Sequence, residues 1–500
     1  MSNLCRKIAT VKSWRNIRFF QIPVIFLLFF TVHNLTMAQK QNEVLITGEA
    51  SFAAGKEIRL IVFDDLLTHT PITVATDKIS KDGFFQLQYK TNRIKVAQLA
   101  IQTSKAEFYI VPGTHYDFII DMNPDLFQLL DPNSYGGFLQ IQPTNLDTNE
   151  LNVKIKKFDL FFEKISESFY PDIVYRKNVQ AFDSLSQIIN NNYKVEYEPL
   201  DFYKSQIFYS YGALEQIMYQ KYPERIYQKY LDNEYILYDN PAYMTFFHSF
   251  YDNYLYTSPR ISKDILTKYI NENPDYLGIF NEVGKDPFLV NERIRELVII
   301  KNLGEFYEDH QFSKKNILQL LNYIKKNTRF PEHKDIVEHV INVTQLLHPN
   351  TEFPKCTLKE VSGVDFKLEK LKGKWVYIQF FTSNCEDCIR EMMILKELAQ
   401  EYKDSIVFVS VSLDFDFGDF SDFRQSYKIF DWQFVHFDYQ FEWLDALEIN
   451  SLPDNILIAP SGKLALRDVL SPEKGLTTFL KRKFTPQEKE YNPLSPHNQN

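Results

Sequence analysis

The sequence WVYIQFFTSNCEDCIREMMIL, residues 375–395, decides the fold of the C-terminal part of this chain. Residues 375–381 form a short apolar run rich in aromatic and β-branched side chains, which is typical of a buried strand. The two cysteines, Cys385 and Cys388, therefore lie at a strand-to-helix turn, because apolar residues then recur at helical spacing at Ile389, Met392, Met393 and Leu395.

The spacing of Cys385 and Cys388 predicts a pair that can form a disulfide and open it again. Residues three apart at a helix start have Cβ atoms roughly 5–6 Å apart, which suits a disulfide. A sulfur at a helix N-terminus is stabilised as a thiolate by backbone N–H groups and the helix dipole. Cys385 is therefore the expected nucleophile and Cys388 the resolving cysteine. A structural disulfide or half of a zinc site is the alternative, but no further ligand lies near in sequence, so we expect no metal.

The first 38 residues have the pattern of a secretory signal peptide. Five basic residues precede an apolar run from Phe19 to Val32, and small residues around Ala38 suit cleavage. The apolar run is shorter than the roughly 20 residues of a membrane-spanning helix. We therefore expect a mature protein in the periplasm or cell envelope, with membrane anchoring as the alternative if the signal is not cleaved.

Composition excludes several classes of function. The chain of 500 residues has a formal net charge of −9, which argues against nucleic-acid binding. After export only Cys356, Cys385 and Cys388 remain, too few for a scaffold held by disulfides. Cys356 is expected to be a buried, inert thiol.

The length suggests about three domains. Residues 39–130 alternate with period two, as at Ile58, Leu60 and Val62, which predicts an antiparallel β-sandwich. Residues 131–148 are rich in Pro, Asn, Ser and Gly and are predicted to form a linker. Residues 150–347 change to a helical period, which predicts an all-α region. Its tyrosines suggest a partner groove or, as we favour, helix packing: Tyr203, Tyr209, Tyr211, Tyr219 and Tyr222.

Residues 353–484 are predicted to run strand, strand, helix, strand (406–412), helix, strand (455–459), strand (463–469) and terminal helix. Residues 485–500 are expected to be disordered. Several motifs follow in order along this region: Gly373-Lys374 before the central strand, the cysteine pair after it, Arg390-Glu391-Met392 in the helix, and Leu452-Pro453 before a strand that ends at Pro460-Ser461-Gly462-Lys463. This ordered set resembles the TlpA/ResA-like thiol-disulfide oxidoreductases and implies a C-terminal α/β thioredoxin fold. The regions before it resemble, more weakly, the extra domains of exported thioredoxin-like proteins of Bacteroidetes.

The resemblance also implies roles for residues outside the cysteine pair. Glu391 would accept the proton of Cys388 during resolution, which requires a raised pKa. The alternative is an exposed helix glutamate. Gln379 occupies the place of a buried acid in thioredoxins, and its amide cannot accept that proton. Leu452-Pro453 matches a cis-proline element whose Leu452 backbone would pair with substrate, with an ordinary trans turn as the alternative.

Acidic residues between the cysteines bear on the direction of exchange. Glu386 and Asp387 place negative charge beside Cys385, which disfavours its thiolate, although both also suit a first helical turn. We expect a reductant, nearer to thioredoxin at about −270 mV than to a strong oxidant at about −120 mV. The chain departs from the family pattern, with consequences for partner choice, at Asn384, Met393 and Asp454.

The sequence thus predicts an exported thiol-disulfide oxidoreductase that needs no cofactor. Its partners would be disulfide-containing or dithiol envelope proteins and an electron-donor thiol protein. One alternative is a non-enzymatic envelope binding or scaffold protein whose thioredoxin fold is a docking domain. A thiol peroxidase is another, because Thr382 and Cys385 have peroxidase spacing, although Ile378 stands where such enzymes carry proline.

Overall fold

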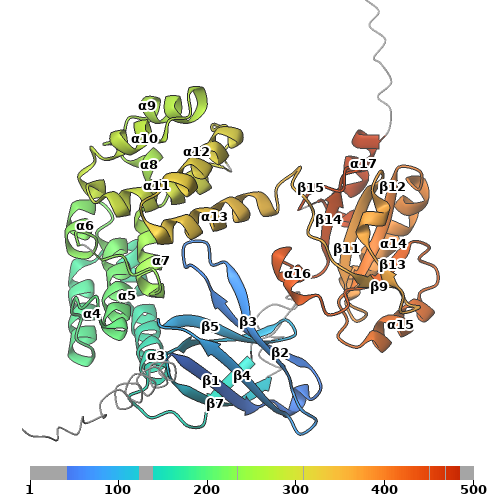
Figure 1. Cartoon of the computed structure of the whole chain (residues 1–500), viewed down its shortest axis with the longest axis horizontal. Helices are drawn as coiled ribbons and strands as arrows, with labels where there is room; N and C mark the ends of the chain where they lie inside the picture. Colours follow the sequence, from blue (N-terminus) through green and yellow to red (C-terminus); the bar gives the residue numbers. More distant parts are fainter. Residues whose placement is uncertain are drawn as a thin grey trace, which may run out of the picture.

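The computed structural model describes residues 42–122 and 139–484, apart from the single residues 234, 308, 450 and 468 (Figure 1). The predicted signal of residues 1–38 and the predicted tail of residues 485–500 lie outside the described residues. Among the helices that are described, none combines the length and the apolar character needed to cross a membrane.

The N-terminal domain contains two four-stranded sheets, with strand orders β4-β1-β7-β8 and β3-β2-β5-β6. Alternate side chains of both sheets point into one hydrophobic cluster, which includes Ile46 of the first sheet and Leu60 of the second. This is the arrangement that period-two sequences favour. The strands are β1 (Glu43–Glu49), β2 (Glu57–Phe63), β3 (Pro71–Lys78), β4 (Phe84–Lys90), β5 (Lys95–Ile101), β6 (Ser104–Ile110), β7 (His115–Met122) and β8 (Leu139–Pro143).

Two features of this domain correct the sequence prediction. Strand β1 pairs with β7 in parallel, with Leu45 opposite His115, so the domain is not wholly antiparallel. Period-two alternation reports which face a residue occupies and carries no information on strand direction. The predicted linker of residues 131–148 contains β8, which pairs antiparallel with β7. This strand has only five residues and ends in proline, so its pattern is too short to identify.

The central region is a layer of helices that begins at Leu151 (Figure 1). Tyr209 and Tyr211 are buried in helix packing, as favoured from the sequence, whereas Tyr222 is exposed. The helices are α3 (Leu151–Tyr170), α4 (Val179–Asn192), α5 (Phe202–Met218), α6 (Pro223–Tyr230), α7 (Pro241–Phe250), α8 (Tyr254–Thr257), α9 (Lys263–Thr267), α10 (Tyr276–Val283), α11 (Glu292–Phe306), α12 (Lys314–Asn327) and α13 (Pro331–Leu346).

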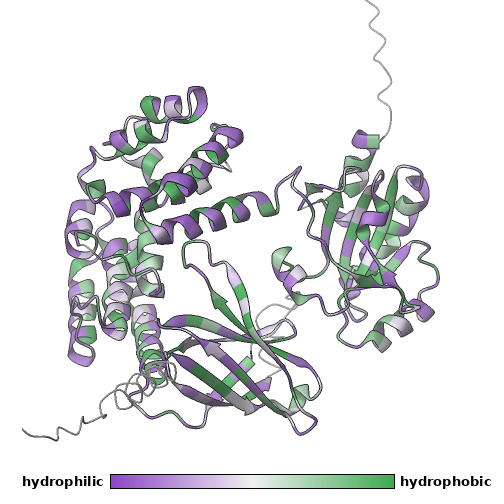
Figure 2. Cartoon of the chain, viewed as in Figure 1, coloured by the Kyte–Doolittle hydropathy of each residue, from purple (hydrophilic) through white to green (hydrophobic). Residues whose placement is uncertain are grey.

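The C-terminal domain has a seven-stranded sheet of order β10-β9-β13-β12-β11-β14-β15. Its central strands are buried on both faces, and Figure 2 shows hydrophobic residues concentrated there. The elements are β9 (Leu358–Lys359), β10 (Asp365–Phe366), β11 (Trp375–Phe381), α14 (Glu386–Glu401), β12 (Ile406–Ser412), α15 (Phe417–Ser426), β13 (Gln433–His436), α16 (Phe441–Ala446), β14 (Asp454–Ile458), β15 (Leu464–Leu466) and α17 (Leu476–Phe484). The short elements β13 and α16 were absent from the sequence prediction.

The two sheet-containing domains contact each other through α16. Asp445 of α16 lies 2.7 Å from Lys105 and 3.7 Å from Arg59, both on the N-terminal sheets. The guanidinium of Arg59 also stands over the ring of Phe441, 5.1 Å from its centroid. Because the Arg59 side chain is buried, this contact contributes more than an exposed ion pair would.

Candidate redox site

The cysteine pair lies where β11 turns into α14. Cys385 is the N-cap of α14, and its Sγ accepts a hydrogen bond from the backbone N–H of Cys388 at 3.1 Å. The two residues form a disulfide with Cα atoms 5.3 Å apart. Cys385 is partly exposed, whereas Cys388 is fully buried. The geometry therefore gives an incoming sulfur access to Cys385 while Cys388 lies beneath it.

Glu391 lies one turn further along α14 and is buried beside two polar side chains. Its carboxylate accepts hydrogen bonds from the side-chain amides of Gln379 at 3.2 Å and Asn455 at 3.4 Å. Gln379 and Asn455 stand opposite each other on β11 and β14. Burial raises the pKa of Glu391, and hydrogen bonds from its neighbours only partly offset this effect. Glu391 is 4% exposed, which excludes the alternative of an exposed helix glutamate. A raised pKa is the property that a general base for Cys388 needs.

The loop before β14 carries the predicted proline element. The Leu452-Pro453 peptide bond is cis, and the Leu452 side chain is buried in the domain core. Asp454, which departs from the family pattern, accepts two hydrogen bonds from the guanidinium of Arg467 at 2.7 and 2.8 Å. Arg467 also donates to the carbonyl groups of Leu447 and of the next residue. The proline loop is therefore tied to the end of α16.

Comparisons with known proteins match the part of the chain that carries the cysteine pair. A family model described as thioredoxin-like matches residues 373–464. The thiol-disulfide oxidoreductase ResA of Bacillus cereus is 27% identical over 136 residues, covering 27% of this chain and 78% of ResA. ResA of Bacillus subtilis is 28% identical over 116 residues, covering 23% of this chain and 63% of that protein. This chain carries a TlpA-like thioredoxin-fold domain. Because its homologues are thiol-disulfide oxidoreductases and the domain is thioredoxin-like, the protein is an oxidoreductase enzyme.

Solved structures from Bacteroides also match little more than a quarter of this chain. A thiol:disulfide interchange protein from Bacteroides sp. is 26% identical and covers 29% of this chain and 95% of its own, with a TM-score of 0.26. A thiol-disulfide oxidoreductase from Bacteroides fragilis is also 26% identical and covers 27% of this chain and 99% of its own, with a TM-score of 0.24.

The two acidic residues between the cysteines affect Cys385 less than the sequence analysis assumed. Asp387 forms an ion pair with Arg390, which also contacts Glu473 at 3.1 Å. Glu386 is exposed to solvent. The negative field at Cys385 is therefore weaker than the sequence implies, because a cation neutralises one acid and water screens the other. The reducing character of the pair stays a prediction.

Two polar side chains near the site were missed by sequence analysis. Asn455 follows Asp454 at the start of β14, before three apolar residues, and only its register opposite Gln379 reveals its role. Asp414 follows β12, and its carboxylate contacts Ser383 in the turn that leads to Cys385. Neither position has a local motif, because both contacts join segments far apart in the sequence.

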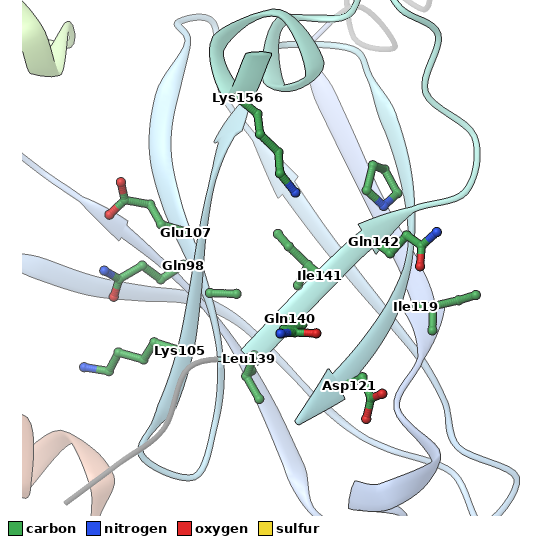
Figure 3. A pocket seen from close by; sticks show the side chains of 12 residues that line it. Gln98, Lys105, Glu107, Ile119, Asp121, Leu139, Gln140, Ile141, Gln142 and Lys156 are labelled. Atoms are coloured by element: carbon green, nitrogen blue, oxygen red, sulfur yellow. The ribbon is translucent and has the colours of Figure 1, made fainter. Parts of the chain in front are cut away.

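Features outside the TlpA/ResA-like cysteine pair offer no second redox centre among the described residues. A hollow of about 900 Å³ on the N-terminal sheets is lined by both charged and apolar side chains, among them Lys105, Lys156 and Ile141 (Figure 3). Cys356 is buried, and burial raises the pKa of its thiol to about 12. Within the part of the chain that the structure covers, His, Cys, Asp and Glu form no group of three or more suited to a metal ion.

Proposed function

We propose that this oxidoreductase is an exported enzyme that reduces disulfides in envelope proteins through Cys385 and Cys388. The observation that carries the proposal is the arrangement of the pair, with a partly exposed sulfur at the N-cap of α14 and a fully buried partner. This is the arrangement that separates attack from resolution in thiol-disulfide exchange.

The reaction proceeds in two steps from the reduced enzyme. The Cys385 thiolate attacks one sulfur of the substrate disulfide, forms a mixed disulfide and releases the other sulfur as a thiolate. Glu391 then takes the proton of Cys388, whose thiolate attacks the Cys385 sulfur and releases the second substrate thiolate. Two electrons pass to the substrate, and the enzyme is left as the Cys385–Cys388 disulfide. An electron-donor thiol protein restores the dithiol by the reverse exchange.

The other parts of the chain fit this role as targeting and presentation elements. Residues 1–38 would direct export. The two N-terminal sheets would pack as a sandwich that, with the helical region of residues 150–347, holds the domain of residues 353–484 near its partners. Substrate would lie along the backbone of Leu452 beside Pro453 as an extended segment.

A trapping experiment tests the proposal. Full-length Cys388→Ser retains the attacking sulfur and lacks the resolving sulfur, so envelope proteins should accumulate as mixed disulfides with Cys385. Cys385→Ser is the matched control and should trap none. Equal capture by both variants, or none by either, would contradict the proposed route.

A non-enzymatic binding role is the second candidate, and the hollow on the N-terminal sheets favours it (Figure 3). The two functions make opposite predictions for a chain with Cys385→Ser and Cys388→Ser together. A cellular phenotype that survives this double substitution and is lost when Lys105 and Lys156 are replaced by Ala would support binding.

A further inference from the structure

We propose that Asp414 is a positioning residue for Cys385, because it fixes the turn that carries this nucleophile at the N-terminus of α14. The inference rests on the proposed function of the cysteine pair. Asp414 lies in the loop between β12 and α15. Since β12 runs parallel to β11, the loops that follow both strands emerge at the same edge of the sheet. Asp414 and the turn before Cys385 therefore meet there.

The Asp414 carboxylate is buried and uses both oxygens. Oδ1 accepts hydrogen bonds from the backbone N–H and the hydroxyl of Ser383, each at 2.8 Å. Oδ2 accepts from the hydroxyl of Ser412 at 2.7 Å. The residue is 6% exposed. A charge removed from water in this way is tolerated only where donors satisfy it, and here Ser383 supplies two of the three.

The backbone of Asp414 is held from its other side by His436. The two are joined by a hydrogen bond of 2.7 Å between His436 Nε2 and the Asp414 carbonyl oxygen. His436 Nδ1 accepts from the backbone N–H of Asp438 at 3.0 Å, so the ring proton lies on Nε2 and is donated to Asp414. His436 is fully buried. Asp414 is thus fixed at both its backbone and its side chain.

The turn that Asp414 holds determines where the Cys385 sulfur lies. The backbone N–H of Cys385 donates to the Thr382 carbonyl at 3.1 Å, which closes a tight turn around Ser383. The sulfur must stay at the N-cap to receive the N–H groups of α14 that stabilise a thiolate. If the bonds to Ser383 are lost, the turn is free to move the sulfur away from the helix end.

The positioning effect and the charge of Asp414 change the pKa of Cys385 in opposite directions, so an experiment can separate them. The negative charge of Asp414 disfavours a nearby thiolate, and by charge alone both Asp414→Ala and Asp414→Asn would lower the pKa of Cys385. Positioning predicts a different pattern. Asp414→Ala loses the acceptor for Ser383 and should raise the pKa of Cys385, whereas Asp414→Asn keeps an acceptor and should not raise it.

The test measures the thiolate pKa of Cys385 by ultraviolet absorbance, and its rate of attack on a disulfide peptide, in the reduced full chain carrying Cys388→Ser. Asp414→Ala should slow attack about tenfold at neutral pH. Asp414→Asn should restore most of the rate. Asp416→Ala is the matched control, because this carboxylate in the same loop only caps α15 through the N–H of Gly418. It should leave both quantities unchanged.

Three results would overturn the inference. These are a lower pKa in both Asp414 variants, no difference between Asp414→Ala and Asp416→Ala, and additive effects of Asp414→Ala and Ser383→Ala in a double-mutant cycle. If circular dichroism shows that Asp414→Ala does not fold, Ser383→Ala tests the inference in its place. That variant should raise the pKa of Cys385 by a smaller amount. Loss of attack in the parent Cys388→Ser chain would instead refute the proposed function, so the two failures are distinct.

Discussion

Replacement of Glu391 by Gln separates the two steps of the proposed exchange. The variant keeps a carbonyl oxygen that can accept hydrogen bonds from the amides of Gln379 and Asn455, so these buried polar groups keep their partner. It loses only the group that can take a proton from Cys388. General-base catalysis contributes about 100-fold or more, so resolution should slow about 100-fold, or about 2.7 kcal/mol of barrier. The first attack by Cys385 should keep its rate.

The pH dependence of resolution follows from the raised pKa of Glu391. The base is active only when ionised, so the resolution rate should fall as pH falls through this pKa in the parent chain and be flatter in Glu391→Gln. Folding stability changes with pH in the opposite direction to the resolution rate. A carboxyl whose pKa is raised by folding favours the protonated native state, so stability is lost as pH rises through that pKa. Glu391→Gln should therefore be more stable than the parent at neutral pH.

Single-turnover kinetics with a disulfide peptide measure the two steps separately, as the appearance and the decay of the mixed disulfide. Glu397→Gln is the matched control, because Glu397 is an exposed glutamate on the same helix. Resolution at the parent rate in Glu391→Gln, or equal slowing in Glu397→Gln, would refute the assignment of Glu391 as the base.

Three further predictions concern contacts around the site and the rest of the chain. Asp445→Ala leaves buried Arg59 without its carboxylate, so hydrogen exchange in α16 should become faster, and unchanged exchange would show that the domain contact is not held there. Arg467→Lys loses the two-pronged contact after the cis-proline and should destabilise the chain by about 2 kcal/mol in chemical denaturation, whereas a loss near zero would argue against this tether. Burial alone would raise the pKa of Glu296, but hydrogen bonds, first from His333, lower it. Its stabilisation is therefore present at neutral pH and lost as pH falls, so Glu296→Gln should flatten the acid side of the stability curve, and an unchanged curve would contradict this.

Local sequence patterns were sufficient for the parts of the site that lie close together in the chain. The apolar run before Cys385 and the helical spacing after Cys388 correspond to β11 and α14. The motif around Pro453 corresponds to a cis bond. The strand and the helix depend on neighbouring residues, whose propensities and packing period can be read directly. The cis bond was implied by the family resemblance and not by a local pattern.

Features that depend on contacts between distant segments could not be predicted. The parallel pairing of β1 with β7 and the contact of Asp414 with Ser383 both join distant residues, and alternation alone does not encode either. Strand β13 has four residues and α16 has six, too few to show a period. The ion pair of Asp387 with Arg390 is different, because the two residues are three apart on one helix and their spacing is visible in the sequence, although the prediction did not use it.

The most direct test of the central claim is a competition between the three thiols of the reduced chain from residue 39 onward, which lacks Cys5. A small alkylating reagent at limiting concentration and neutral pH, followed by mass spectrometry, reports which sulfur is ionised and reachable. We predict that Cys385 is modified first, while Cys388 and Cys356 stay unmodified until the protein unfolds. Modification of Cys388 or Cys356 before Cys385, or protection of all three, would contradict the account.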